Sequence, residues 1–162
     1  MKWTGLFISI SFLLISCATP YQPKGSMGGF YETRINENVY RVSFKGNAYT
    51  SLEKATYFTM LRSAELTLEK GYYHFLVIDE EQYFKEVTSK TPDRTSYSTR
   101  VRKSADRIRL KVTVKNYPGQ EITTYKPRSS NTIMMFKYPP ADEYFDARYV
   151  MRTIKNEYNL QN

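Results

Sequence analysis

Residues 50–78 read TSLEKATYFTMLRSAELTLEKGYYHFLVI and form the most strongly patterned part of the chain. Thr50 is followed three residues later by Glu53, and this capping-box spacing predicts the start of a helix. Good helix formers without an internal Gly or Pro continue to Lys70, and Gly71 stands where a glycine commonly ends a helix. Helical spacing aligns one apolar stripe along this segment: Tyr57, Leu61, Ala64 and Leu68.

Strands are predicted on both sides of this helix. Residues 72–78 are aromatic or aliphatic at almost every position, which is typical of a central strand covered on both faces. Upstream, residues 30–35 and 39–45 flank a short polar turn and predict a β-hairpin. Strand, helix and strand together form a crossover unit, which we expect to be right-handed.

More strands are predicted downstream. Residues 107–115 alternate apolar and basic side chains, and we expect the apolar ones to point inward. Pro118 and Gly119 predict a turn, after which the chain returns as a strand over residues 122–125. Residues 132–138 form a further apolar strand that ends before two prolines.

A second helix is predicted near the C-terminus, with Asp146 as its N-cap and one apolar stripe: Ala147, Val150, Met151, Ile154 and Tyr158. Residues 85–104 consist of Ser, Thr and charged residues without an apolar period, so a long loop, a lid and an irregular hairpin all stay open. Together the elements predict a single α+β domain over residues 30–162. Its sheet is expected to be mainly antiparallel, with about five to six strands and two helices packed on it.

The N-terminus has the pattern of an export signal. Lys2 supplies a positive charge, and residues 6–15 form an apolar run shorter than the about 20 residues that a membrane-spanning helix needs. The run ends in LISC at residues 14–17, which resembles the lipobox of bacterial lipoproteins. This resemblance implies a diacylglycerol thioether at Cys17, cleavage before it, and acylation of the new amine.

The domain boundaries follow from this signal. Residues 1–16 are predicted to be removed, and residues 17–29 are predicted to be the lipidated cysteine and a flexible tether, since 18–29 read ATPYQPKGSMGG. Ala18 stands where an aspartate would retain a lipoprotein at the inner membrane in enteric-type sorting. We therefore expect an outer-membrane lipid anchor with the domain on the periplasmic side.

Residue counts exclude several kinds of chemistry. Cys17 is the only cysteine and His74 the only histidine, so neither an internal disulfide nor a Cys/His metal cluster is available. No nucleotide-binding, serine-hydrolase or zinc-protease motif is present. His74 is flanked by aromatic residues, and we interpret it as structural. We predict no catalytic residue, no metal and no cofactor, and expect a non-enzymatic protein.

Two acidic patterns are interpreted in the same way. Asp79, Glu80 and Glu81 lack the spacing of a calcium loop and are predicted to be a solvated strand end. Arg62 and Glu65 lie three residues apart on the first helix, which predicts a local ion pair.

The charge of the chain is concentrated in one segment. Residues 100–128 hold nine basic residues and two acidic ones, a net charge of +7 that equals the net charge of residues 17–162 as a whole. The strand pattern places four of these cations on one face: Arg107, Arg109, Lys111 and Lys115. Such a face attracts anionic polymers or surfaces, although a solvated outer face that prevents aggregation has the same pattern.

Four short segments resemble a family of small, uncharacterised lipoproteins of Gram-negative bacteria. They are GGFYETR at residues 28–34, YRVSFKGN at 40–47, AELTLEKGY at 64–72 and DAR at 146–148. The basic segment is not part of the shared pattern. The resemblance implies the same location and fold, and carries no catalytic residues.

These observations favour an outer-membrane-anchored periplasmic module that binds an envelope partner. The membrane is one expected partner through Cys17, and an envelope protein, an anionic lipid or peptidoglycan is a second. Nucleic acid is not expected in that compartment. The alternative is an envelope enzyme or a small-ligand-binding domain with residues 85–104 as its lid.

Overall fold

Residues 17–104, 107–141 and 143–160 are described by a computed structural model, and the predicted signal at 1–16 lies outside them. They form helices α1 (Leu52–Glu69) and α2 (Ala147–Glu157) and seven strands: β1 (Gly29–Arg34), β2 (Val39–Lys45), β3 (His74–Lys90), β4 (Arg94–Ser104), β5 (Arg107–Tyr117), β6 (Glu121–Phe136) and β7 (Phe145–Asp146). The predicted α+β class, with a mainly antiparallel sheet and two helices, is confirmed. In this part of the chain no helix combines the length and apolar character needed to cross a bilayer.

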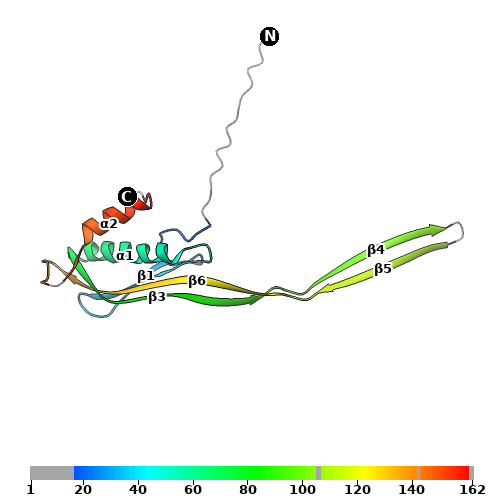
Figure 1. The fold of residues 1–162 in the computed structure, drawn as a ribbon, viewed down its shortest axis with the longest axis horizontal. Coiled ribbons are helices and arrows are strands. Elements are labelled where there is room, and N and C mark those ends of the chain that lie inside the picture. The colour runs from blue at the N-terminus through cyan, green and yellow to red at the C-terminus, as the bar shows by residue number, and fades with distance from the viewer. Residues whose placement is uncertain (1–16, 105–106, 142, 161–162) are drawn as a thin grey trace, which may run out of the picture.

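Five strands form the main sheet in the order β1-β2-β6-β3-β7, and each neighbouring pair is antiparallel. The predicted hairpin is β1 and β2, with a register that runs from Gly29↔Lys45 to Arg34↔Tyr40. Because β2 and β3 both run antiparallel to β6, α1 connects two parallel strands across the strand between them. Figure 1 shows both helices on one side of the sheet, which leaves its other face uncovered.

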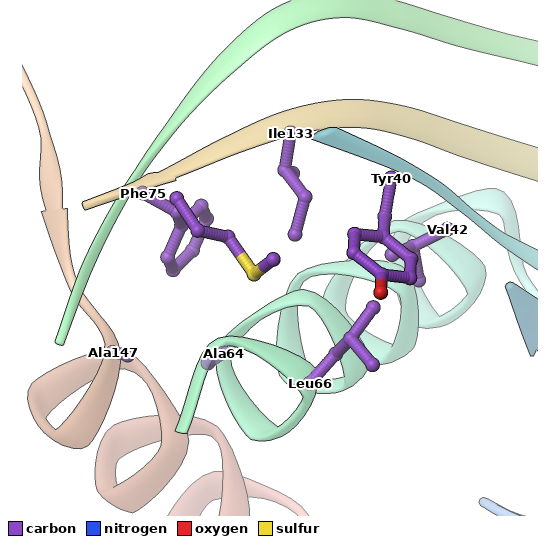
Figure 2. Close-up of a cluster of buried hydrophobic side chains, with 8 residues drawn as sticks. Tyr40, Val42, Ala64, Leu66, Phe75, Ile133 and Ala147 are labelled. Carbon is purple, nitrogen blue, oxygen red and sulfur yellow. The ribbon is translucent and has the colours of Figure 1, made fainter. Parts of the chain in front are cut away.

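The core lies between α1 and the covered face of the sheet. Its main cluster contains buried side chains from both helices and three strands (Figure 2): Tyr40, Val42, Ala64, Leu66, Phe75, Ile133, Met135 and Ala147. A second cluster forms near the start of α1, where the rings of Phe44 and Phe58 meet edge to face with centroids 5.2 Å apart. Alternate residues of the strands supply this core, as the period of a half-buried strand requires.

The start of α1 differs by one residue from the prediction. Ser51 is the N-cap, and its hydroxyl accepts a hydrogen bond from the backbone N–H of Lys54 at 3.1 Å. The Thr50 hydroxyl accepts instead from the backbone N–H of Thr19 at 2.9 Å, so the predicted Thr50 capping box is wrong. Gly71 ends the helix with φ of 79°, as predicted.

The apolar stripe of α1 is only partly confirmed. Leu61 and Ala64 are buried, whereas Tyr57 is 41% exposed and Phe58 takes its place in the core. The stripe of α2 is confirmed, because all its members are buried or half-buried: Ala147, Val150, Met151, Ile154 and Tyr158. The Asp146 cap is also confirmed, since its carboxylate accepts from the backbone N–H of Tyr149 at 2.9 Å.

β3 is covered on one face and not on both, which corrects the prediction for residues 72–78. Phe75 is fully buried, but Ile78 is 52% exposed. The register with β6 shifts between Val77 and Asp79, so Ile78 sits in a β-bulge. The reason for the difference is that both helices pack on the same side of the sheet.

Residues 85–104 form strands, and none of the three alternatives describes this segment: its two strands do not pair with each other but with β6 and β5, so it is one side of a longer two-stranded arm. They comprise the second half of β3, a connection and β4, and β4 pairs with β5 in a separate two-stranded sheet. The predicted return of residues 122–125 against 107–115 is wrong, because 122–125 belong to β6 and pair with β3. Pro118 and Gly119 lie at a junction where both strands pass from one sheet into the other.

Side chains and backbone hold this junction together. The backbone N–H of Gly119 donates to the Asp93 carboxylate at 2.7 Å, and the backbone N–H of Thr91 donates to the Gln120 carbonyl at 2.9 Å. An added Cβ at Gly119 would lie 1.9 Å from the Thr91 carbonyl oxygen. The close approach of the two strands therefore requires glycine here.

Residues 17–29, hereafter the N-terminal strap, pack against the domain, which corrects the prediction of a flexible tether. Thr19 is fully buried, and its hydroxyl accepts from the backbone N–H of Asn47 at 2.8 Å. The Asn47 side chain donates to the Cys17 carbonyl at 2.7 Å, so the ordered contacts extend to Cys17 itself. Tyr21 packs on Phe30 with ring centroids 4.8 Å apart. The polar and proline-rich composition hid these contacts.

Candidate functional site

A long two-stranded arm projects from the body of the domain (Figure 1). β2 ends opposite Arg128, so residues 84–127 have no third strand beside them. The 21 residues from 84 to 104 span about 70 Å at about 3.3 Å per residue. The outer half of the arm consists of β4 and β5, hereafter the ribbon.

The ribbon collects basic side chains on one face. In the antiparallel register, Arg102 lies opposite Arg109, and Arg100 lies opposite Lys111. Residues opposite one another share a face, and alternate residues along each strand do so too. These rules define the cationic face by seven residues: Arg94, Arg100, Arg102, Arg107, Arg109, Lys111 and Lys115.

The structure therefore brings together the four cations predicted from the sequence and adds three from β4. Arg94, Arg100 and Arg102 were not recognised as members of the same face, because β4 was not predicted as a strand. The signal for it was present, since Tyr97, Thr99 and Val101 alternate with polar residues over residues 96–102.

The opposite face of the ribbon is exposed and carries large apolar side chains along its middle, with Lys103 near its tip. Tyr97 pairs with Val114, and Val101 pairs with Leu110. The exposed fractions of the large apolar side chains on this face are between 52% and 72%: Tyr97, Val101, Leu110, Val112 and Val114. The prediction that the apolar side chains of 107–115 point into a core is wrong for Leu110, Val112 and Val114, because nothing in the described chain covers them.

Charge on the cationic face is not neutralised within the described residues. None of the ion pairs found in residues 17–104, 107–141 and 143–160 involves a member of this face. Like charges placed directly opposite one another weaken a ribbon. A two-stranded hairpin is also marginally stable by itself in water. The ribbon thus maintains an arrangement that costs folding stability and that an anionic partner would relieve.

The geometry around His74 gives little support to the alternative of an envelope enzyme with a lid. His74 and Lys90 are the two ends of β3, about 50 Å apart by strand rise, so residues 85–104 do not lie over His74 as a lid. The His74 ring meets Tyr144 edge to face with centroids 4.9 Å apart. Its Nδ1 atom is buried without a hydrogen-bond partner in the described structure. Asp146 lies opposite His74 in the register of β3 and β7, and its carboxylate accepts from the backbone N–H of Tyr149 at 2.9 Å.

The acidic residues considered earlier lie elsewhere on the surface. Asp79, Glu80 and Glu81 are exposed, and Glu81 accepts from Arg41 at 2.6 Å in an ion pair. The predicted pair of Arg62 and Glu65 is confirmed at 3.6 Å. No group of three or more metal-ligating side chains was found in the described part of the chain.

Arg62 belongs to a larger network than predicted. Its guanidinium donates to Glu69 at 2.6 Å and to Glu32 at 2.9 Å. Burial alone would lower the pKa of Arg62, but the hydrogen bonds to Glu69 and Glu32 outweigh burial and raise it above the ordinary value. Burial and a hydrogen bond to Glu65 raise the pKa of the Tyr21 hydroxyl. This network joins strap, sheet and helix, and we regard it as structural.

The ribbon is therefore the described surface that best fits a binding site for a partner. It presents two exposed faces of opposite character at the end of a long arm. Comparison of the chain with protein-family models, with curated proteins and with solved structures finds no match.

Proposed function

We propose that this protein is a non-enzymatic envelope lipoprotein, anchored in the outer membrane through Cys17, whose ribbon binds an anionic lipid surface. One observation carries the choice of ligand: the cationic face and the exposed apolar face lie on opposite sides of the same two strands. Elements with one apolar and one basic face bind at the boundary between headgroups and acyl chains, as amphipathic helices do.

A lipid surface uses both faces of the ribbon. The side chains of Leu110, Val112 and Val114 contact the acyl boundary, and the cationic side chains reach the phosphates from the other side of the strands. The unpaired backbone groups along the ribbon edges stay hydrated at this depth. Peptidoglycan, a polar anionic polymer, would engage only the cationic face and leave the apolar face in water.

The test compares vesicle binding of matched variants. The chain 17–162 with Cys17→Ser contains every element of the described fold, so it is mixed with vesicles of phosphatidylglycerol and phosphatidylcholine or of phosphatidylcholine alone. We expect binding to the anionic vesicles that falls as salt is added. Changing four cations to Gln should weaken this binding on the order of a thousandfold, at about 1 kcal/mol per cation near an anionic surface: Arg107, Arg109, Lys111 and Lys115.

A control variant removes the same charge from exposed residues outside the ribbon: Lys90→Gln, Lys137→Gln, Arg148→Gln and Arg152→Gln. It should bind close to the unchanged chain. Leu110→Gln with Val112→Gln should weaken vesicle binding although no charge changes. Circular dichroism checks that each variant is folded. Sedimentation with isolated peptidoglycan but not with vesicles would show that the partner is the cell wall and that the lipid proposal is wrong.

A further inference from the structure

A second group of cations lies at the root of the arm, beside the N-terminal strap. Residues from the strap, the end of β2 and β6 line a hollow of about 310 Å³, within the range of about 300–1,000 Å³ typical of small-ligand sites. We call its four cations the base site: Lys24, Lys45, Lys126 and Arg128. The base site is separate from the ribbon.

The base site holds like charges close together without an acidic partner. The ammonium groups of Lys24 and Lys45 lie 4.9 and 4.8 Å from the centre of the same ring, that of Tyr31. The residues that line the hollow include no aspartate or glutamate. None of the ion pairs in the described chain involves these four cations. An anion is the ligand that such a group favours.

The Arg128 side chain is fixed at the edge of this hollow. One of its guanidinium nitrogens, Nη1, donates to the Gly46 carbonyl at 3.0 Å and to the Pro127 carbonyl at 3.2 Å. The backbone around Gly46 is tight, because an added Cβ would lie 2.7 Å from the Pro127 ring. Arg128 is therefore positioned before any ligand arrives, which lowers the entropic cost of binding.

The base site also lies next to the predicted lipid anchor. Asn47, which lines the hollow, donates from its side chain to the Cys17 carbonyl at 2.7 Å. Met27, another lining residue, is 57% exposed, and nearby Tyr49 is 74% exposed. Exposed apolar side chains beside cations and an acylated residue are what a membrane-facing surface contains.

We infer that the base site binds the phosphodiester group of an anionic phospholipid in the same leaflet that holds Cys17. The inference depends on the proposed acylation of Cys17, and is independent of what the ribbon binds. Acyl chains on Cys17 would hold the hollow at the level of the headgroups, because the Cys17 carbonyl accepts a hydrogen bond from Asn47, which lines the hollow. Phosphates would then lie within reach of the Lys24 and Lys45 ammonium groups.

The experiment measures hydrogen exchange by mass spectrometry in the unacylated chain 17–162 with Cys17→Ser. Vesicles of phosphatidylglycerol and phosphatidylcholine should protect residues 24–28 and 45–47, and phosphatidylcholine vesicles should not. The variant Lys24→Gln, Lys45→Gln, Lys126→Gln should lose this protection and bind the anionic vesicles on the order of a hundredfold more weakly. The matched control removes three charges elsewhere and should keep the protection: Lys90→Gln, Lys137→Gln and Arg152→Gln.

Different results would contradict the two lipid-binding proposals, for the ribbon and for the base site. The base variant keeps all seven cations of the ribbon, so exchange protection in residues 94–117 reports on the ribbon alone. Unchanged protection of residues 24–28 in the base variant would overturn the base site. Protection by inorganic phosphate but not by vesicles would assign the hollow to a free anion and overturn the lipid inference. If the triple variant does not fold, Lys24→Gln alone, at an exposed position of the strap, gives the same comparison.

Discussion

At the scale of single residues, the contact between Tyr21 and Glu65 joins the strap to α1. The Tyr21 hydroxyl donates to the Glu65 carboxylate at 2.5 Å, and Glu65 is also paired with Lys155 at 3.1 Å and with Arg62. The Tyr21 ring meets Phe58 edge to face with centroids 5.3 Å apart. A residue from a segment with the composition of a linker is thus part of the folded core.

Tyr21→Phe tests this contact through its dependence on pH. At pH 8 the loss of the hydrogen bond should lower the free energy of unfolding by about 1–2 kcal/mol. Burial raises the pKa of Tyr21 in the folded state above its unfolded value, so its stabilising effect is complete below about pH 10 and is lost as the pH rises further.

The decline amounts to about 1.4 kcal/mol per pH unit above the unfolded pKa. Urea denaturation of both proteins should therefore show a difference at pH 8 that has almost vanished near pH 11. Titration of lysines affects both proteins equally and cancels in the comparison. A difference that stays constant from pH 8 to pH 11 would mean that Tyr21 ionises normally in the folded protein.

At the scale of elements, the strap is the main feature that sequence patterns did not predict. Its turns depend on Gly28 and Gly29, whose φ angles are 100° and 123°. An added Cβ at Gly28 would lie 2.2 Å from the Lys45 carbonyl oxygen. Glycines that suggest flexibility in a sequence here permit close packing of backbone on backbone.

Gly28→Ala should therefore destabilise the domain, by on the order of 2 kcal/mol, because both the φ angle and the contact with Lys45 are incompatible with a side chain. Gly25→Ala is the control, since no atom lies within 4 Å of its added Cβ. It should change stability by less than about 0.5 kcal/mol. Thermal denaturation of both variants makes the comparison, and equal, negligible effects would restore the flexible tether.

The elements predicted correctly are those whose patterns are local. The β1–β2 hairpin, α2 with its Asp146 cap and the Gly71 helix end all follow from periodicity and capping within a few residues. α1 is different, because the strap and α2 also cover it and polar residues enter its buried side. The hydroxyls of Thr59, Ser63 and Thr67 are satisfied by backbone carbonyls four residues earlier in the helix.

The arm is predicted only in part by local sequence patterns. Alternation in residues 107–115 predicted a strand correctly, and the four cations on one face followed from it. The strand that pairs with residues 107–115 was not predicted correctly. Pro118 and Gly119 have the composition of a hairpin turn but occupy a junction between two sheets. The apolar side chains of this strand were predicted to point into a core, whereas Leu110, Val112 and Val114 are exposed. The base site was not predicted at all, since its cations come from three distant segments.

At the scale of the whole molecule, the positive charge lies at both ends of the arm. The base site is at its root and the cationic face is on its outer half, with about 70 Å from the end of the third strand to the tip. Acidic residues of the main sheet and of α1 pair with other cations, as in the pairs Arg41–Glu81 and Arg62–Glu69. The fold therefore separates two cationic surfaces along one two-stranded arm.

Acylation of Cys17 is the prediction on which the membrane anchor and the inference for the base site depend. Mass spectrometry of the protein extracted from membranes should find an N-terminal Cys17 that carries diacylglycerol and an amide-linked acyl chain. Cys17→Ser should release the protein from the anchored membrane fraction in high salt, because the remaining cationic contacts are screened over about 8 Å. An unmodified N-terminus at another residue would contradict the anchor, while leaving the vesicle experiments on both cationic surfaces interpretable.

The ordered strap has a consequence for the local concentration of the ribbon. With Cys17 acylated as proposed, an arm of about 70 Å would confine its tip to a hemisphere near the anchor, which corresponds to an effective concentration on the order of 2 mM. Contacts too weak to retain a freely diffusing domain would then be occupied most of the time within this radius. Beyond the radius the same contacts would be absent, so the length of β3 to β6 defines the distance over which the protein can act.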